Sequence, residues 1–262
     1  MVKLSIYQID AFAEKAFEGN PAAVVPLEKW LVDETLQAIA AENNLSETAF
    51  FVPRDGYFHI RWFTPKKEVE LCGHATLASA FVLFSELGYV QDIVRFDSLS
   101  GPLSVIREEN SLTLEFPAQK PEKCEIPDGL TEGLGKSPAE CYSNADYIAV
   151  FESENDIANI EPNYSHLAQL DLRGVIITAP SSDYDFVSRF FVPKYGIPED
   201  PVTGSAHTQL VPYWSERSGK TKLQAKQISS RGGKLTCELK GNRVLISGSA
   251  VKYLEGTIEI VD

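Results

Sequence analysis

Two segments of the chain combine a glycine with a polar residue in front of a helix-like run. Gly73 and His74 precede the apolar run 75–87, and Gly204 and Ser205 precede a second, more polar run. The first turn of a helix exposes unpaired N–H groups, and the aligned peptide dipoles make that end positive. Glycine lets a ligand approach the backbone closely. Two such helix starts could therefore bind a small carboxylate, even in an acidic protein.

Acidic and imidazole side chains near these glycines could transfer protons. Glu47 lies between the turn "NNLS" and the apolar run "TAFF". A carboxylate that removes and returns a proton needs a pKa raised from about 4.3, and burial would raise it because burial disfavours the charged form. His74 carries an imidazole, which titrates near neutrality without assistance. Residue type alone leaves a surface glutamate and a structural histidine as the ordinary interpretations of Glu47 and His74, with a catalytic role in proton transfer as the alternative.

The second glycine segment supplies further candidates. Asp200 could orient a substrate or polarise a histidine, and we include it in the catalytic set, although it could also be a helix cap or a loop carboxylate. Ser205 could bind substrate or cap the helix. Asn20, within "GNP", could hydrogen-bond a ligand, although holding the turn is the simpler interpretation. With Gly73 and Gly204, Ser205 and Asn20 form the candidate substrate-binding set.

The elements that must position these residues are arranged as a duplication. "RWFTPK" begins at Arg61 and "RFFVPK" begins at Arg189, an offset of 128 residues. "LSVIREENSLTLEFP" from Leu103 resembles "LTCELKGNRVLISG" from Leu235, at an offset of 132. Similar offsets predict two halves of similar fold related by an approximate two-fold axis, and ligand sites favour the interface between such halves. Arg61 and Arg189, placed equivalently, could form ion pairs between the halves or attract the substrate.

Within each half, short strands surround one main helix. Residue patterns predict strands over 3–12, 47–53 and 57–65, a turn followed by a short strand over 19–26, and helices over 33–44 and 75–87. The helix over 75–87 is apolar nearly all round, so it should be enclosed on most sides. Pro212 in the corresponding second helix should kink it or remove one backbone hydrogen bond. These elements favour a mixed α+β fold over a doubly wound parallel sheet.

The domain boundary is expected in the middle of the chain. Residues 118–141 are rich in proline, glycine and charge. We therefore place an N-terminal lobe at residues 1–120 and a C-terminal lobe at residues 121–262, with a last strand that could return to the first lobe.

Composition limits the class of partner. The chain has 262 residues and a formal net charge of -13, which argues against nucleic acid or an anionic membrane as a partner. No apolar stretch reaches the ~20 residues of a membrane span, and the first residues do not resemble a signal peptide. The four cysteines have no short spacing, so we expect no zinc site and no other metal. These features predict a cytoplasmic protein with free thiols.

The motifs in order along the chain resemble one known family. They are "GNPAAVV" at 19–25, "SETAFF" at 46–51, "RWFTPKKEVELCGHAT" at 61–76, "EDPVTGSAHTQLVPYW" at 199–214, "SSRGGKL" at 229–235 and "GSAVKYLEG" at 248–256. Together they are specific and span nearly the whole chain. The sequence is similar to the phenazine-biosynthesis isomerase-like (PhzF-like) family, which shares its fold with diaminopimelate epimerase.

This resemblance implies two similar lobes, each a mixed sheet wrapped round a central helix, with an active site between them and no cofactor. It implies that Glu47 is the general acid/base and that His74, Asp200 and Ser205 line the site, with backbone from Gly73 and Gly204. The characterised family reaction isomerises trans-2,3-dihydro-3-hydroxyanthranilate, so we expect a small anionic carboxylate as substrate. Family members often pair, which makes a homodimer plausible.

Three functions are compatible with these residues. The first is a cofactor-independent isomerase in which Glu47 moves a proton between two carbons of a small carboxylate. The second is a one-thiol racemase or epimerase, because Cys72 stands where the epimerase relatives carry a catalytic thiol. The second loop, "DPVTGSAH", has no cysteine, so a two-thiol exchange is unavailable and we expect Cys72 to be a buried small apolar residue. The third is a binding protein that has lost turnover.

Overall fold

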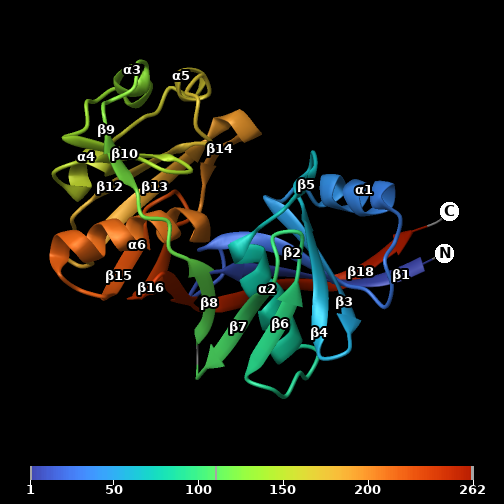
Figure 1. The fold of residues 1–262 in the computed structure, drawn as a ribbon. Coiled ribbons are helices and arrows are strands. Elements are labelled where there is room, and N and C mark those ends of the chain that lie inside the picture. The colour runs from blue at the N-terminus through green and yellow to red at the C-terminus, as the bar shows by residue number, and fades with distance from the viewer. Residues whose placement is uncertain (1, 110, 261–262) are drawn as a thin grey trace. The chain divides into compact units, whose positions relative to one another are not determined.

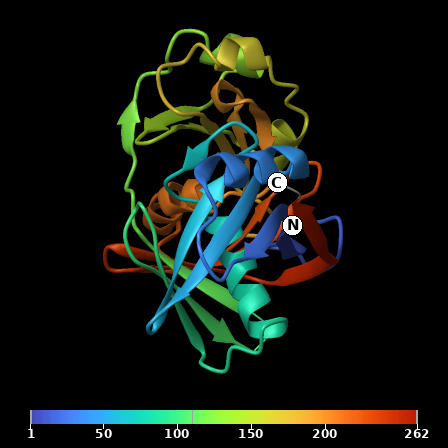
Figure 2. The same ribbon diagram turned by 90° about the vertical axis from the view of Figure 1, so that its right-hand side faces the viewer.

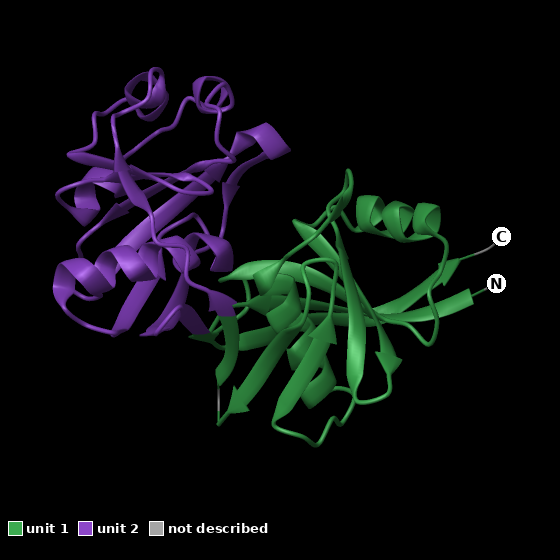
Figure 3. Cartoon of the chain, viewed as in Figure 1, with its two compact units in different colours: residues 1–115, 247–262 green, residues 116–246 purple. Residues whose placement is uncertain are grey.

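The chain forms two compact units, each of which is described by itself. The computed structural model describes residues 2–109 and 111–260 (Figure 1). Unit 1 comprises Met1–Glu115 and Ser247–Asp262, and unit 2 comprises Phe116–Ile246 (Figure 3). The sequence placed the boundary between residues 120 and 121, close to the start of unit 2. The final strand returns to unit 1, which was the possibility that the sequence left open.

Unit 1 is a mixed sheet around one buried helix. β1 pairs with β2 and β18 in antiparallel orientation, β2 pairs with β3 in parallel, and β3 pairs with β4 in antiparallel orientation. The sheet continues through a parallel β4–β6 pair to the antiparallel strands β6, β7 and β8. The elements are β1 (Val2–Ala11), β2 (Asn20–Pro26), α1 (Asp33–Asn43), β3 (Glu47–Arg54), β4 (Tyr57–Phe63), β5 (Glu68–Val69), α2 (Gly73–Ser85), β6 (Ile93–Asp97), β7 (Leu103–Glu108), β8 (Ser111–Pro117) and β18 (Ala250–Ile260).

The helix α2 lies at the centre of unit 1. It packs against β1, β2, β3, β7 and β18 of the same unit (Figures 1 and 2). Its sequence explains this position, because alanine and leucine favour helix and the helix has an apolar side chain on nearly every face. Ala75, Leu77, Ala78, Ala80 and Val82 are completely buried. The prediction of a helix enclosed on most sides is confirmed.

Unit 2 repeats the same plan with more small helices. β11 pairs with β12 in parallel, β12 with β13 in antiparallel orientation, and β13 with β15 in parallel. Both units therefore contain parallel and antiparallel pairs, and the predicted mixed α+β fold is confirmed. The elements are β9 (Glu122–Cys124), α3 (Leu130–Leu134), β10 (Glu140–Ser143), β11 (Tyr147–Val150), α4 (Glu154–Ala158), α5 (Tyr164–Leu167), β12 (Val175–Ala179), β13 (Phe186–Val192), η1 (Pro193–Tyr195), β14 (Ile197–Asp200), α6 (Gly204–Ser218), β15 (Lys222–Gln227), β16 (Gly233–Lys240) and β17 (Arg243–Gly248).

Strand register aligns the two units residue by residue. In unit 1, Phe50 of β3 lies opposite Arg61 of β4. In unit 2, Ile177 of β12 lies opposite Arg189 of β13. The first strand of each antiparallel pair also has a parallel neighbour on its other side. That neighbour is β2 beside β3 in unit 1 and β11 beside β12 in unit 2. Phe50 and Ile177 are therefore equivalent positions, and three residues earlier Glu47 corresponds to Gly174.

The two duplicated arginines stabilise their own units. Arg61 donates from Nε and Nη2 to the two carboxylate oxygens of Glu68, both at 2.7 Å. Arg189 makes the same bidentate contact with Glu199, at 2.8 and 2.9 Å. The Nη1 of Arg61 donates to Asp33, and the Nη1 of Arg189 donates to two backbone carbonyls. All three nitrogens of each guanidinium are used within one unit. The question that the sequence left open is thus answered in favour of structural ion pairs, each inside its own unit.

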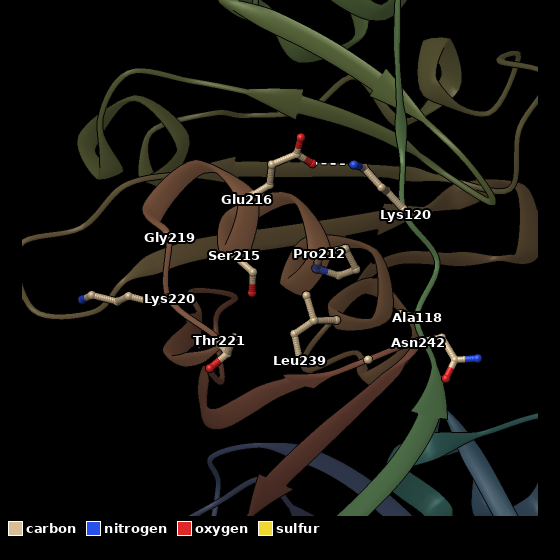
Figure 4. Close-up of a pocket in the computed structure, with 11 residues that line it drawn as sticks. Ala118, Lys120, Pro212, Ser215, Glu216, Gly219, Lys220, Thr221, Leu239 and Asn242 are labelled. Carbon is tan, nitrogen blue, oxygen red and sulfur yellow. Dashed lines mark ion pairs between the residues drawn. The ribbon is translucent and has the colours of Figure 1, made fainter.

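The proline within α6 removes one helical hydrogen bond, as predicted. Pro212 has no N–H to donate to the carbonyl of Thr208, and the N–H of Gln119 donates to that carbonyl instead, at 3.0 Å. Pro212 and Ser215 of α6 line a pocket together with Leu239 of β16 (Figure 4). Lys120 and Glu216, which also line it, form an ion pair at 2.7 Å. No residue predicted to be catalytic or substrate-binding lines this pocket.

Candidate active site

In unit 1, the structure brings the predicted acid and the predicted histidine together. Glu47 is the first residue of β3 and His74 is the second residue of α2. Glu47 Oε2 lies 3.3 Å from His74 Nε2, and the two side chains are only 13% and 6% exposed. The angles at this contact do not make a hydrogen bond to Nε2 of His74. A partly exposed carboxylate therefore faces a buried imidazole at the start of a central helix.

The second nitrogen of His74 faces a thiol. Cys72 Sγ lies 3.5 Å from His74 Nδ1. Cys72 is 7% exposed, so it is as buried as the sequence led us to expect. It is nevertheless more than a small apolar residue, because its sulfur contacts the imidazole. Cys72 is also the N-cap residue of α2, and its extended backbone positions Gly73 and His74 in the first turn.

Burial keeps the His74 ring neutral. Removal from water lowers the pKa of His74 to about 3, because the low-dielectric interior disfavours the imidazolium. A neutral imidazole has one N–H donor and one acceptor nitrogen. Because its two nitrogens face different partners, His74 can accept a proton at one nitrogen and release one at the other. The arrangement of thiol, imidazole and carboxylate can therefore relay a proton.

The same three residues are possible metal ligands by chemical type. One ligand atom from each of Glu47, Cys72 and His74 lies within 4.8 Å of the others. Thiolate, imidazole and carboxylate are all zinc ligands. A shared ion would take only one ring nitrogen, whereas here the two nitrogens of His74 face separate partners. The geometry thus suits proton transfer along the ring better than joint coordination.

In unit 2, the residue that corresponds to Glu47 has no side chain. A Cβ atom on Gly174 would lie 2.6 Å from the carbonyl oxygen of Phe191 and 2.5 Å from a methyl group of Val192. Real Cβ atoms essentially never come this close to backbone atoms, so packing against β13 keeps position 174 as glycine. Unit 2 therefore cannot carry a carboxylate at the equivalent position.

Asp200 belongs to a polar network that shapes the loop before α6. Asp200 Oδ2 accepts a hydrogen bond from the hydroxyl of Thr203, the N-cap residue of α6. The backbone N–H of Thr203 donates to Gln227 Oε1 at 2.9 Å, and Gln227 Nε2 donates to the carbonyl of Asp200 at 2.6 Å. The side chain of Gln227 is therefore the link between β14 and the start of α6. Within unit 2, Asp200 holds the loop that leads to Gly204.

Ser205 contacts an arginine that the sequence did not identify. Arg173 Nη2 donates to Ser205 Oγ at 3.1 Å, and Arg173 Nε donates to Asp146 Oδ1 at 2.8 Å. Neither residue lies in a recognisable motif. Their one sequence signal is the duplication, because "SNAD" at 143–146 precedes β11 as "GNPA" at 19–22 leads into β2.

The remaining predicted residues lie at the starts of elements. Gly73 and Gly204 are the first residues of α2 and α6, and no N-cap side chain bonds to either helix. Asn20 is the first residue of β2, is completely buried and lies opposite Ala11. Gly19, with φ +66°, takes the strained turn position in front of it. Asn20 is therefore a strand residue rather than the turn residue that we preferred.

Comparison with known proteins identifies the family. The family model described as "Phenazine biosynthesis-like protein" matches residues 9–256. An uncharacterized isomerase of Pseudomonas aeruginosa is 54% identical over 99% of this chain and 100% of its own length. The human phenazine biosynthesis-like domain-containing protein is 40% identical over 98% of this chain and 99% of its own. The chain therefore belongs to the phenazine biosynthesis-like family.

Solved structures agree with this assignment. A phenazine biosynthesis protein of the PhzF family from Enterococcus faecalis is 48% identical, with a TM-score of 0.97 over 99% of this chain and 100% of that one. A hydroxyproline epimerase from Agrobacterium vitis, with a TM-score of 0.65 and 10% identity over 98% of this chain and 92% of that one, shares the fold alone. Full-length relatives at 43–54% identity are named isomerases, in agreement with the expected class of enzyme. Among the described residues, no helix combines the length and apolarity needed to cross a membrane.

Proposed function

We propose that this protein is a cofactor-independent isomerase that moves a proton between two carbons of a small carboxylate, with Glu47 as the general acid/base. The observation that carries this proposal is the buried pair of Glu47 and His74, with 3.3 Å between Oε2 and Nε2. A largely buried carboxylate next to a neutral imidazole is equipped to accept a proton from carbon and to return it.

The proposed reaction conserves atoms and electrons without a further reagent. Glu47 removes a proton from one carbon of an unsaturated substrate, and the electron pair of the broken C–H bond forms a new double bond to the neighbouring carbon. The π electrons of the former double bond move to its far carbon. The proton then returns from Glu47 to the carbon at the far end of the shifted bond. The substrate changes the position of its double bond but not its formula. His74, in contact with the acid, exchanges a proton with it between turnovers.

Helix starts support the choice of a carboxylate as substrate. The first-turn N–H groups of α2 and α6 are not bonded by an N-cap side chain, whereas Ser153 and Asn163 cap the short helices α4 and α5. N–H groups at a helix start favour a negative charge, including the charge that develops during proton removal. The expectation that one substrate uses both units stays a prediction, as do the homodimer and the cytoplasmic location.

Deuterium exchange tests the proposal. The Glu47→Gln variant should lose about 1,000-fold in deuterium uptake from heavy water by trans-2,3-dihydro-3-hydroxyanthranilate or by related cyclic carboxylates, because the amide cannot accept the proton. Its thermal unfolding should stay close to that of the unsubstituted protein. Glu70→Gln removes one exposed negative charge two residues before Cys72 and is the matched control, with uptake unchanged. Comparable uptake by Glu47→Gln and the unsubstituted protein would show that another group transfers the proton.

The contact between Cys72 and His74 favours one alternative, a one-thiol epimerase. At 3.5 Å, the imidazole could activate the thiol as a base. The Cys72→Ala variant separates the two functions. Our proposal expects uptake within about fivefold of the unsubstituted protein, whereas the epimerase requires its loss. A protein that binds carboxylates but exchanges no carbon-bound proton under any condition would instead be the binding protein considered from the sequence.

A further inference from the structure

Arg173 of unit 2 is held rigidly in front of helix α6. Its Nε and Nη2 donate to the two carboxylate oxygens of Asp146, which is completely buried. Gln209 Nε2 donates to the same carboxylate at 2.7 Å, and Gln209 Oε1 accepts from the backbone N–H of Asp146 at 3.3 Å. Asp146 is thus fixed from two sides, and it fixes the plane of the guanidinium in turn.

Two further contacts direct this guanidinium toward the start of α6. Nη2 also donates to Ser205 Oγ at 3.1 Å, and the ring of Phe190 lies 5.3 Å from the guanidinium carbon. Burial acts to lower the pKa of Arg173, but hydrogen bonding and the charge of Asp146 outweigh it and leave the pKa above its usual value. The guanidinium is therefore charged and oriented before any ligand arrives.

One nitrogen of Arg173 has no hydrogen-bond acceptor among the residues that the structure describes. Among residues 2–109 and 111–260, no group accepts a hydrogen bond from Nη1 of Arg173, and the side chain is 35% exposed. The structural arginines differ in both respects. Arg61 and Arg189 use all three nitrogens and are 16% and 11% exposed. An arginine kept only to join elements would resemble those two, whereas Arg173 keeps two N–H groups open to solvent.

We propose that Arg173 is a specificity residue that binds the carboxylate of the substrate, and that Asp146 and Gln209 are its positioning residues. This inference rests on the proposed function and names the residue that selects acids over uncharged analogues. Nη1 donates to one carboxylate oxygen, and the uncapped N–H groups at Gly204 and Ser205 lie at the same helix start. A planar, charged donor selects a carboxylate over an amide of the same shape.

The test compares acids with their matched amides. Benzoate, 2-aminobenzoate and cyclohexene carboxylates are titrated beside the corresponding amides, and binding is followed by calorimetry and by the side-chain nitrogen NMR signals of Arg173. The unsubstituted protein should bind at least one acid about tenfold or more tightly than its amide, because a hydrogen bond to a charged group is at stake. Arg173→Gln should bind the acid and its amide about equally tightly, and Arg173→Lys should keep part of the preference for the acid.

Two additional variants control for charge and for folding. Arg217→Gln removes a positive charge from the last turn of the same helix and should leave the preference unchanged. Arg173→Gln leaves Asp146 buried without its partner and risks unfolding, so the double variant Arg173→Gln/Asp146→Asn removes both charges together. The double variant should fold and should also lose the preference.

The outcomes separate this inference from the proposed function. Undiminished acid preference in Arg173→Gln and in the double variant, or Arg173 signals that no acid in the panel shifts, would show that Arg173 only ties α6 to β11 and β12. Failure of the proposed function would appear elsewhere, as deuterium uptake that persists in Glu47→Gln. The Glu47→Gln variant should retain the acid preference, because Glu47 is not part of the Arg173 cluster.

Discussion

The starts of α2 and α6 occupy equivalent places in the two units but carry different chemistry. In unit 1, Glu47 and His74 meet at 3.3 Å. In unit 2, the equivalents of these residues are Gly174 and Ser205, and Ser205 binds Arg173. Under our two proposals, the start of α2 serves proton transfer and the start of α6 holds a negative charge. A duplicated fold can keep its framework while the two copies specialise.

The framework that both units keep is the arginine–glutamate pair on neighbouring strands. Arg61 and Arg189 lie over Phe63 and Phe191 at 5.1 and 4.9 Å, and each binds a glutamate through two nitrogens. The carbonyl of each N-cap residue is also bonded by a side chain four residues later. Thr76 donates to Cys72 at 2.6 Å, and His207 Nδ1 contacts the Thr203 carbonyl at 2.8 Å.

Within this comparison, the largest expected effect is the loss of deuterium uptake when the polar residue at each helix start is replaced. His74→Asn should lower deuterium uptake by about 100- to 1,000-fold, because Glu47 loses its imidazole partner. Ser205→Ala should lower it by no more than about tenfold, because Arg173 keeps its contacts with Asp146. Both rates are measured with the substrates used for Glu47→Gln. Equal losses in the two variants would remove the functional difference between the helix starts.

A smaller effect, on stability, is expected from adding a methyl group at position 174, where unit 2 has a glycine in place of the carboxylate of unit 1. Gly174→Ala should reduce the free energy of unfolding by about 3 kcal/mol, because its Cβ meets the Phe191 carbonyl and Val192. Gly256→Ala is the control, since its Cβ would have only ordinary contacts with Ile6 and Leu254 at 3.8 and 3.9 Å. Urea unfolding of both variants measures the difference. If Gly174→Ala is as stable as the control, packing does not explain the missing carboxylate.

The smallest effect concerns pH. Burial lowers the pKa of His207 to about 4, from an ordinary value of about 6.5. Between these values the unfolded chain binds a proton that the folded protein does not, so stability falls as the pH decreases from about 6.5 to 4. His74 contributes in the same direction, with its pKa lowered to about 3.

His207→Thr copies the residue at the equivalent position of unit 1, Thr76. The variant should lose about 2 kcal/mol at pH 7, because a smaller side chain leaves a cavity. The free energy of unfolding of the variant should then change less between pH 6.5 and 4.5 than that of the unsubstituted protein. The difference in slope corresponds to up to about one bound proton. Urea unfolding at several pH values measures this slope. His166→Gln, at an exposed site, is the control, and a His207→Thr slope equal to its slope would contradict the assignment.

The sequence predicted the fold, and it indicated residues that the structure places together at the start of α2, because both depend on local patterns. The apolar run of α2 indicated a central helix, and the motif around Glu47 and His74 indicated an acid and a histidine. Cys72 was only partly understood, since its burial was expected but its contact with His74 was not. Asn20 was interpreted as a turn residue, yet it lies in a strand. Such details depend on where neighbouring strands pair.

By itself, the sequence determined which side chains could transfer a proton, that two similar halves exist, and that each half begins its main helix at a glycine. Only the tertiary structure decided that Asp146 and Arg173, which are 27 residues apart, form one cluster with Ser205. It also decided that position 174 has no room for a side chain. The physical reason is that residue type and spacing fix local conformation, whereas strand register and close packing fix which distant side chains meet.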